Sequence, residues 1–153
     1  PQMAKNISND KPHIYTSAQQ RFVRGVLYIS ILILLAVTAV IPGALHLMYR
    51  ADAQVALGHA KSVRMAFRVL AAEQYGSDSN MFDIYEKGGV SAGLYDEIIQ
   101  LSGVDGDFQV LLADKEDTYS VKRFMYEEGE FTVYYDSDTS SYTVYRKQTL
   151  IEP

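Results

Sequence analysis

The sequence has no cysteine, and histidine occurs only three times among its 153 residues. The missing thiol excludes disulfide bonds, cysteine nucleophiles and thiolate metal sites. The histidines, His13, His46 and His59, lie in parts of the chain that we expect to stay apart, and no Ser/His/Asp set can be assembled around them. We therefore predict that the protein is not an enzyme and that it binds no cofactor.

Positive charge is scarce after residue 24. Residues 1–24 hold four Lys/Arg and one Asp, a net charge of +3, whereas the remaining residues hold 10 Lys/Arg and 18 Asp/Glu, a net charge of −8; together they give the −5 of the whole chain. The acidic part argues against a nucleic-acid partner, because binding to phosphates requires a basic surface. No feature of the sequence indicates a small-molecule substrate.

Charged residues are absent from Gly25–Tyr49, a run of 25 residues without Lys, Arg, Asp or Glu. As a helix this run would reach about 37 Å, more than the hydrocarbon core of a bilayer at about 30 Å. A single segment in lipid must satisfy its own backbone hydrogen bonds, so we predict a membrane-spanning helix over residues 21–49, anchored by Arg24. Pro42 and Gly43 predict a kink or a short unwound section within it.

The basic residues before this span predict its orientation. Positive residues beside a span are retained in the cytoplasm, so we expect residues 1–20 to be a polar cytoplasmic tail and residues 50–153 to form an extracytoplasmic or cell-surface head. A cleaved signal peptide also has a basic flank, but its apolar region is usually only about 7–15 residues long. The length of the run favours an uncleaved anchor and a single-pass protein whose first partner is the lipid bilayer.

An amphipathic helix is expected to follow the span, with Gly76 as its stop. Its apolar residues recur at a spacing of three or four: Ala56, Ala60, Val63, Phe67 and Leu70. The simplest reading is one helix from about Ser17 to Tyr75, whose outer half needs something to cover its apolar side.

The rest of the head predicts a short helix and then strands. Ser91 could cap a helix that ends at Leu101, with Leu94, Ile98 and Leu101 on one side and Gly103 after its end. Period-two alternation then indicates four strands, at Asp107–Ala113, Thr118–Tyr126, Phe131–Asp136 and Ser141–Lys147. A change of face near Arg123–Phe124 indicates a bulge. Short turns favour an antiparallel meander, so the predicted fold is α+β: a long helix packed on a small four-stranded antiparallel sheet.

Two features of the strands are candidate sites. Five of the twelve tyrosines fall in or beside the last hairpins: Tyr126, Tyr134, Tyr135, Tyr142 and Tyr145. Both faces of the strands carry them, so one face must be core, and the other is either a contact surface or ordinary cross-strand pairing. The acidic turns 114–117 and 136–138 could bind calcium, but turns also collect Asp for backbone hydrogen bonds, and no twelve-residue calcium loop is present.

The order of these parts resembles type IV pilins and pilin-like proteins, including the pseudopilins of secretion systems, over most of residues 21–146. Local sequence is also similar, in Ala39–Pro42 (AVIP), Tyr49–Gln54 (YRADAQ), Ala60–Arg68 (AKSVRMAFR), Gly103–Phe108 (GVDGDF) and the tyrosine-rich Phe124–Arg146. The resemblance implies a structural or accessory subunit of a filament, pilus or secretion assembly at the bacterial surface, with a role such as cell adhesion. It would associate with copies or paralogues through the N-terminal helix.

The chain departs from the family at the peptidase cleavage site. When Phe22 is set on the family's Phe, Arg21 takes the place of the required Gly, and Val26 takes that of a Glu thought to bind the neighbouring subunit's terminal amine. Processing between Arg21 and Phe22 is therefore not expected. Either this is an uncleaved accessory subunit, or it belongs to another secretion-like assembly with the same architecture.

The alternative function is a membrane-tethered sensory or ligand-binding module. It would need a pocket among Tyr95, Phe108 and the hairpin aromatics, together with a cytoplasmic signalling partner. A tail of about 20 residues is too short to be a signalling domain, and this argues against the sensory function.

Overall fold

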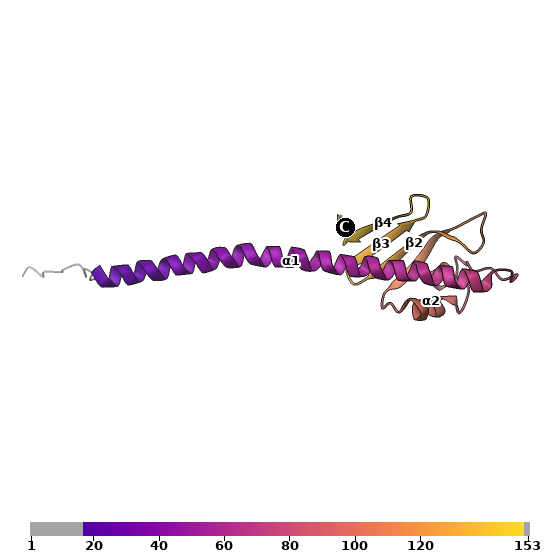
Figure 1. The fold of residues 1–153 in the computed structure, drawn as a ribbon, viewed down its shortest axis with the longest axis horizontal. Helices are drawn as coiled ribbons and strands as arrows, with labels where there is room; N and C mark the ends of the chain where they lie inside the picture. The colour runs from indigo at the N-terminus through magenta and orange to yellow at the C-terminus, as the bar shows by residue number, and fades with distance from the viewer. Residues whose placement is uncertain (1–16, 152–153) are drawn as a thin grey trace, which may run out of the picture. The chain divides into compact units, whose positions relative to one another are not determined.

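The computed structural model describes residues 17–151, so most of the predicted tail, residues 1–16, lies outside the described residues. The elements are α1 (Ser17–Gln74), a 3-10 turn η1 (Lys87–Gly89), α2 (Leu94–Ser102), β1 (Asp107–Ala113), β2 (Val121–Glu128), β3 (Phe131–Asp136), β4 (Ser141–Arg146) and β5 (Thr149–Ile151) (Figure 1). This order confirms the predicted α+β class. The chain divides into two compact units, Pro1–Leu45 and His46–Pro153, which we call the anchor unit and the head unit and describe separately.

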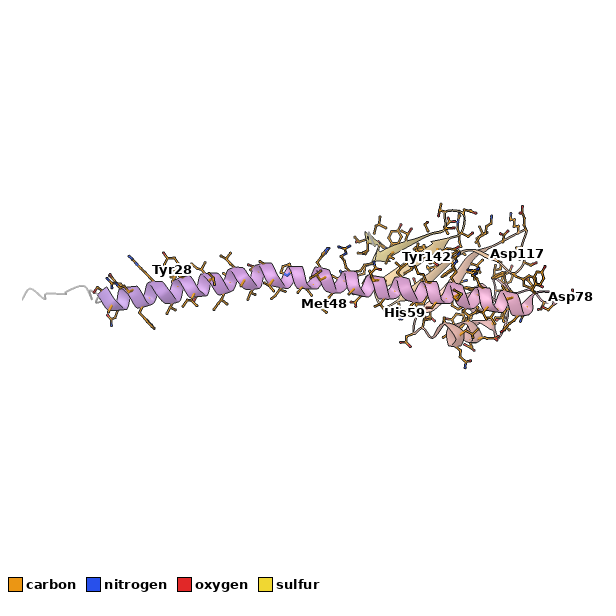
Figure 2. All side chains as sticks on the ribbon, in the orientation of Figure 1. Tyr28, Met48, His59, Asp78, Asp117 and Tyr142 are labelled. Carbon is orange, nitrogen blue, oxygen red and sulfur yellow. The ribbon has the colours of Figure 1, made fainter. Side chains whose placement is uncertain are left out.

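In the anchor unit, residues 17–45 of α1 form a helix whose apolar side chains are exposed all round. Figure 2 shows these side chains along the helix, with Tyr28 labelled, which is 71% exposed. The most apolar 18-residue window of α1 has a mean hydropathy of 2.5 and no buried residue. Among residues 17–151, α1 is the one helix that is long and apolar enough to cross a membrane.

The helix continues through Pro42 and Gly43 without the unwound section that the sequence suggested. Proline removes one hydrogen bond from the i→i−4 series, but the bonds of the residues before and after it remain. The loss of one bond therefore does not open the helix here, although Gly43 beside the proline is itself a poor helix former.

In the head unit, the five strands form one antiparallel sheet in the order β1-β2-β3-β4-β5. The prediction of four strands was wrong, because β5 pairs with β4 through Val144 and Ile151, Tyr145 and Leu150, and Arg146 and Thr149. The turn between these strands consists of Lys147 and Gln148, both with positive φ (45° and 74°). Such a turn usually contains Asn, Asp or Gly, and none of these marks it in the sequence.

The pairing of β1 with β2 has two irregularities, and one of them is the bulge predicted on β2 near Arg123. There Leu112 pairs with Arg123 and Ala113 pairs with Val121, so Lys122 is an extra residue in β2. The other irregularity lies on β1. Val110 pairs with Phe124 while Leu112 pairs with Arg123, so Leu111 is an extra residue in β1. The strand β2 pairs with β3 in unbroken register. The extra residue Lys122 lets Val121 and Phe124 both pack against the core although they are three residues apart, and this is the change of face predicted from the sequence.

The core of the head lies between α1 and the inner face of the sheet. All five predicted core residues of the helix are buried. Phe67 packs edge-on against Phe108 of β1, with ring centroids 5.2 Å apart, and also lies 5.7 Å from the Phe124 ring of β2. Alanines at positions 53, 56, 60 and 66 of the same side are buried too.

The short helix α2 differs from the prediction at its start and on its buried side. It begins at Leu94 after Gly93, and the hydroxyl of Ser91, the predicted cap, donates a hydrogen bond to the Asn80 carbonyl instead. Tyr95 is buried on Phe108, with stacked rings 4.7 Å apart, whereas Leu101 is exposed in the last turn. Gly103 ends the helix as predicted, with φ 64°.

Two glycines of the head test how tightly this region is packed. Gly88 and Gly93 both have positive φ, 72° and 89°. A Cβ on Gly88 would overlap the Tyr95 ring and lie 3.0 Å from Phe108 Cε2, whereas a Cβ on Gly93 would meet nothing within 4 Å. The two positions therefore share the cost of the left-handed backbone and differ in the cost of overlap.

We expect Gly93→Ala to lower the free energy of unfolding by about 1–2 kcal/mol. Gly88→Ala should lower it by about 1–3 kcal/mol more, because the Tyr95–Phe108 stack must move. Urea unfolding of the full-length protein in detergent micelles, followed by tyrosine near-ultraviolet circular dichroism, measures both. Equal losses would show that the stack does not depend on Gly88.

Candidate interaction surfaces

The residues predicted to anchor the chain all lie within α1 of the anchor unit. Arg21, Phe22, Arg24 and Gly25 follow the described start of the helix at Ser17, so the bond between Arg21 and Phe22 has helical backbone on both sides. The Phe22 side chain is 73% exposed. A Cβ added to Gly25, or to Gly43 further along the helix, would meet no atom within 4 Å. Within residues 17–151, the small size of these glycines therefore serves no packing.

The five tyrosines divide between the two faces of the sheet. Tyr126 and Tyr135 are buried in the core, and Tyr142 is half-buried beside them. Including Tyr126 and Tyr135 in an interaction surface was therefore wrong. The candidate surface on the outer face of the sheet consists of Tyr134 and Tyr145, whose rings meet edge to face with centroids 5.6 Å apart.

A shallow hollow of about 470 Å³ lies on this outer face. It is lined by uncharged side chains that can donate and accept hydrogen bonds: Thr132, Tyr134, Thr143, Tyr145 and Gln148. The turn between β4 and β5 brings Gln148 to the tyrosines, which the sequence analysis could not foresee because it ended the sheet at Lys147. The pocket that the ligand-binding alternative needed beside Tyr95 and Phe108 is instead filled by the stacking of those two rings.

Basic side chains of α1 cover the tyrosines at the margin of the core. The guanidinium of Arg64 lies 4.5 Å from the centre of the Tyr135 ring, and Lys61 Nζ lies 5.7 Å from that of Tyr142. Arg146 of β4 lies 3.5 Å from the centre of the Tyr49 ring, near the start of the head unit. Lys61 and Arg64 therefore place positive charge along one flank of α1, and all three cation–π contacts join the helix to the strands.

A hydrogen-bonded network that sequence reasoning missed joins α1 to β2. His59 Nδ1 lies 2.6 Å from Glu128 Oε2, and the Tyr126 hydroxyl donates to the same oxygen at 3.0 Å. The backbone N–H of Gly106 donates to the Tyr126 hydroxyl at 3.1 Å. His59 and Glu128 are 69 residues apart, so no spacing or motif in the sequence could have paired them. Figure 2 labels His59 on the helix.

The acidic turns use their carboxylates locally. Asp114 accepts the N–H of Glu116, and Asp117 accepts the N–H of Tyr119. In the second turn, Asp136 is paired with Arg123, with its Oδ2 2.9 Å from Nε. Within residues 17–151, no three His, Asp or Glu side chains converge where a metal ion could be held.

The fold and these surfaces define an α+β protein with one helix that could cross a membrane and with a two-layered head. Comparison of the chain with protein-family models, with curated proteins and with solved structures found no match.

The network around Tyr126 predicts how the head responds to alkali. Burial, and then the hydrogen bond to Glu128, raise the pKa of the Tyr126 phenol above its ordinary value, and burial with the bond to Asp107 does the same for Tyr95. The pKa of each phenol is higher in the folded state than in the unfolded state, where it is about 10. The stabilisation that each phenol gives the fold is therefore fully present at pH values below about 10. That stabilisation is lost as the pH rises above about 10, because the unfolded chain then releases its protons first.

We expect Tyr126→Phe to lower the free energy of unfolding by about 1–3 kcal/mol at neutral pH, because it removes both hydrogen bonds of the hydroxyl. The further loss between neutral pH and strong alkali should be smaller than in the unsubstituted protein, since the contribution of Tyr126 is gone and that of Tyr95 remains. Urea unfolding across this pH range measures both effects. Tyr134→Phe on the outer face is the control, and an alkaline loss that is the same in both variants would contradict the assignment.

Proposed function

We propose that this protein is a non-enzymatic structural or accessory subunit of a type IV pilus-like or secretion-like assembly, held in a membrane and associated with its neighbours through α1. The observation that carries the proposal is the composition of α1 along its length. One uninterrupted helix, Ser17–Gln74, is apolar and exposed all round in the anchor unit, and supplies one layer of the core in the head unit. This division of one helix between two environments is the layout expected of pilin-like subunits.

The exposed apolar part of α1 supports a membrane as the first partner. An apolar helix with no buried residue in its most hydrophobic window is unfavourable in water, and lipid removes that cost. Arg21 and Arg24 precede the apolar run, so we propose that the N-terminal side is cytoplasmic and the head extracytoplasmic.

Gly25 and Gly43 support helix association within the membrane. Helices in lipid pack where small residues let their backbones approach, because the lipid tails are as apolar as the side chains they replace. Neither glycine is needed by packing inside this chain. We propose that they are points of close approach for a neighbouring subunit.

The leader is proposed to stay on the chain. Arg21 stands where the peptidase of the pilin family requires Gly, and Val26 cannot form the ionic contact that the family makes with the terminal amine of a neighbour. An uncleaved subunit would suit an accessory position better than a place in the bulk of a filament. The alternative, a ligand-binding module, would have to use the hollow beside Tyr134 and Tyr145, because the rings of Tyr95 and Phe108 stack on each other.

The proposed topology can be tested directly, because the chain has no cysteine of its own. A single cysteine at Thr139→Cys, in the turn between β3 and β4, should react with a membrane-impermeant maleimide on intact cells. Ser17→Cys, at the start of α1, should react only after the cells are permeabilised. The reverse pattern, or labelling of neither residue before permeabilisation, would contradict an extracytoplasmic head.

Association through the anchor unit can also be tested with single cysteines, because the chain has no cysteine of its own. Single cysteines placed in turn at residues 31–37 should form disulfide-linked pairs on oxidation in the native membrane, with yields that rise and fall every three to four residues. Only monomers at every position would contradict a subunit that assembles through α1. An even yield at every position would indicate random collision.

A further inference from the structure

The part of α1 that belongs to the head has a second apolar side, opposite the one that packs on the sheet. We call it the outer face of α1, and it consists of Ala51, Val55, Gly58, Ser62, Met65, Val69 and Ala72. Its three large residues are well exposed: Val55 by 51%, Met65 by 58% and Val69 by 41%. No strand of the head covers this face, because the sheet occupies the side that carries Ala60, Val63 and Phe67.

The spacing along the outer face is that of a helix–helix contact. Its residues alternate steps of four and three, which is the seven-residue repeat of two helices that pack along their length. Ser62 does not interrupt the apolar character, because its hydroxyl donates to the Gly58 carbonyl of the same helix at 3.2 Å. The repeat is maintained over three heptads, or about six helical turns, from Ala51 to Ala72.

Gly58 lies at the centre of the outer face and gives an independent indication of a close neighbour. Glycine destabilises the interior of a helix relative to alanine, so its presence calls for a compensating contact. A Cβ at Gly58 would meet nothing within 4 Å in this chain, so packing inside the head does not require glycine there. A second helix that packs closely at this point would require it.

Charges beside the outer face favour a parallel neighbour of the same sequence. Arg68 flanks Val69 on one side, and Glu73 flanks Ala72 on the other. In a parallel pair of heptad-spaced helices, Arg68 of one copy faces Glu73 of the other. An antiparallel pair would place Asp52 opposite Glu73, which are both acidic. Within residues 17–151, no ion pair involves Arg68 or Glu73, so both are available for this contact.

We infer that the outer face of α1 binds the same face of a second copy of this chain, in parallel and in register, with Gly58 at the closest approach. The inference rests on the proposed function, because a common membrane anchor is what holds the copies parallel. It goes beyond that proposal by naming the surface and the neighbour outside the membrane. The two flanks then pair symmetrically, Arg68 with Glu73 and Glu73 with Arg68.

The register can be tested with single cysteines on the full-length protein in its membrane. Val55→Cys and Val69→Cys should each form a disulfide-linked homodimer on oxidation, because each residue meets its own counterpart in a parallel pair. Asp52→Cys, which is exposed on the same helix but lies off the outer face, is the matched control and should link poorly. Linkage only in a mixture of Val55→Cys with Val69→Cys would indicate an antiparallel pair and overturn the inference.

Substitution of Gly58 separates association from folding. Gly58→Ala should raise the melting temperature of the full-length protein in dilute detergent micelles, because alanine favours the helix. In the membrane the same change, made in the Val69→Cys background, should lower dimer yield, and Gly58→Leu should lower it by about tenfold or more. Opposite signs for stability and association cannot arise from misfolding. An unchanged dimer yield in both Gly58 variants would overturn the role of Gly58.

The remaining outcomes decide between this inference and the function on which it rests. If cysteines at residues 31–37 link but Val55→Cys and Val69→Cys do not, the outer face is not the contact and the proposed function stands. If neither set links, both fail. Linkage of Val55→Cys and Val69→Cys only to a protein of different mass would show that the occupant is another subunit and overturn the pairing of identical copies.

Discussion

The structure of the head depends on the contact between one side of α1 and the inner face of the sheet. A five-stranded sheet with Phe108, Phe124 and Val133 on one face cannot leave that face in water, and α1 is the element that covers it. Phe67 fills the space between the layers, and its burial contributes about 1.5–3 kcal/mol. The core around it combines the large aromatic side chains of the sheet with the small alanines of α1. The His59–Glu128 contact at 2.6 Å adds a polar link at the edge of this core.

That contact leaves two parts of α1 without cover from the chain itself. In the anchor unit the helix is apolar on every side, so no orientation of it is compatible with water. In the head unit it is apolar on the side away from the sheet, in a repeat that suits one further helix. Lipid can cover the first part, and a protein surface can cover the second. A protein built in this way depends on its surroundings along most of one helix, and this is the physical basis for the proposal that it belongs to an assembly.

Sequence periodicity predicted the parts of this fold in which local pattern and tertiary packing agree. The three-to-four spacing gave the five buried residues of α1 from Ala56 to Leu70, and alternation gave the strands β1, β3 and β4 almost to the residue. It missed β5 because the Lys147–Gln148 turn adopts positive φ without a turn residue. It could not sort the tyrosines, since Tyr134 and Tyr135 are equally suited to a strand and only the cover supplied by α1 decides which is buried. The Tyr126 network was beyond reach because it depends on tertiary placement alone.

The glycines differ in whether packing within the described chain explains their small size. Gly88 and Gly106 are surrounded by the head, where an added Cβ would overlap Tyr95 and Tyr126 respectively, so their small size is explained by internal packing. The three glycines of α1 at positions 25, 43 and 58 have no such neighbour, although each weakens the helix that carries it. A glycine that destabilises its helix and makes no packing contact in the described chain is explained if a neighbouring molecule packs closely against it. All three lie on the element that the chain leaves exposed, so the glycines and the uncovered apolar faces independently favour association through α1.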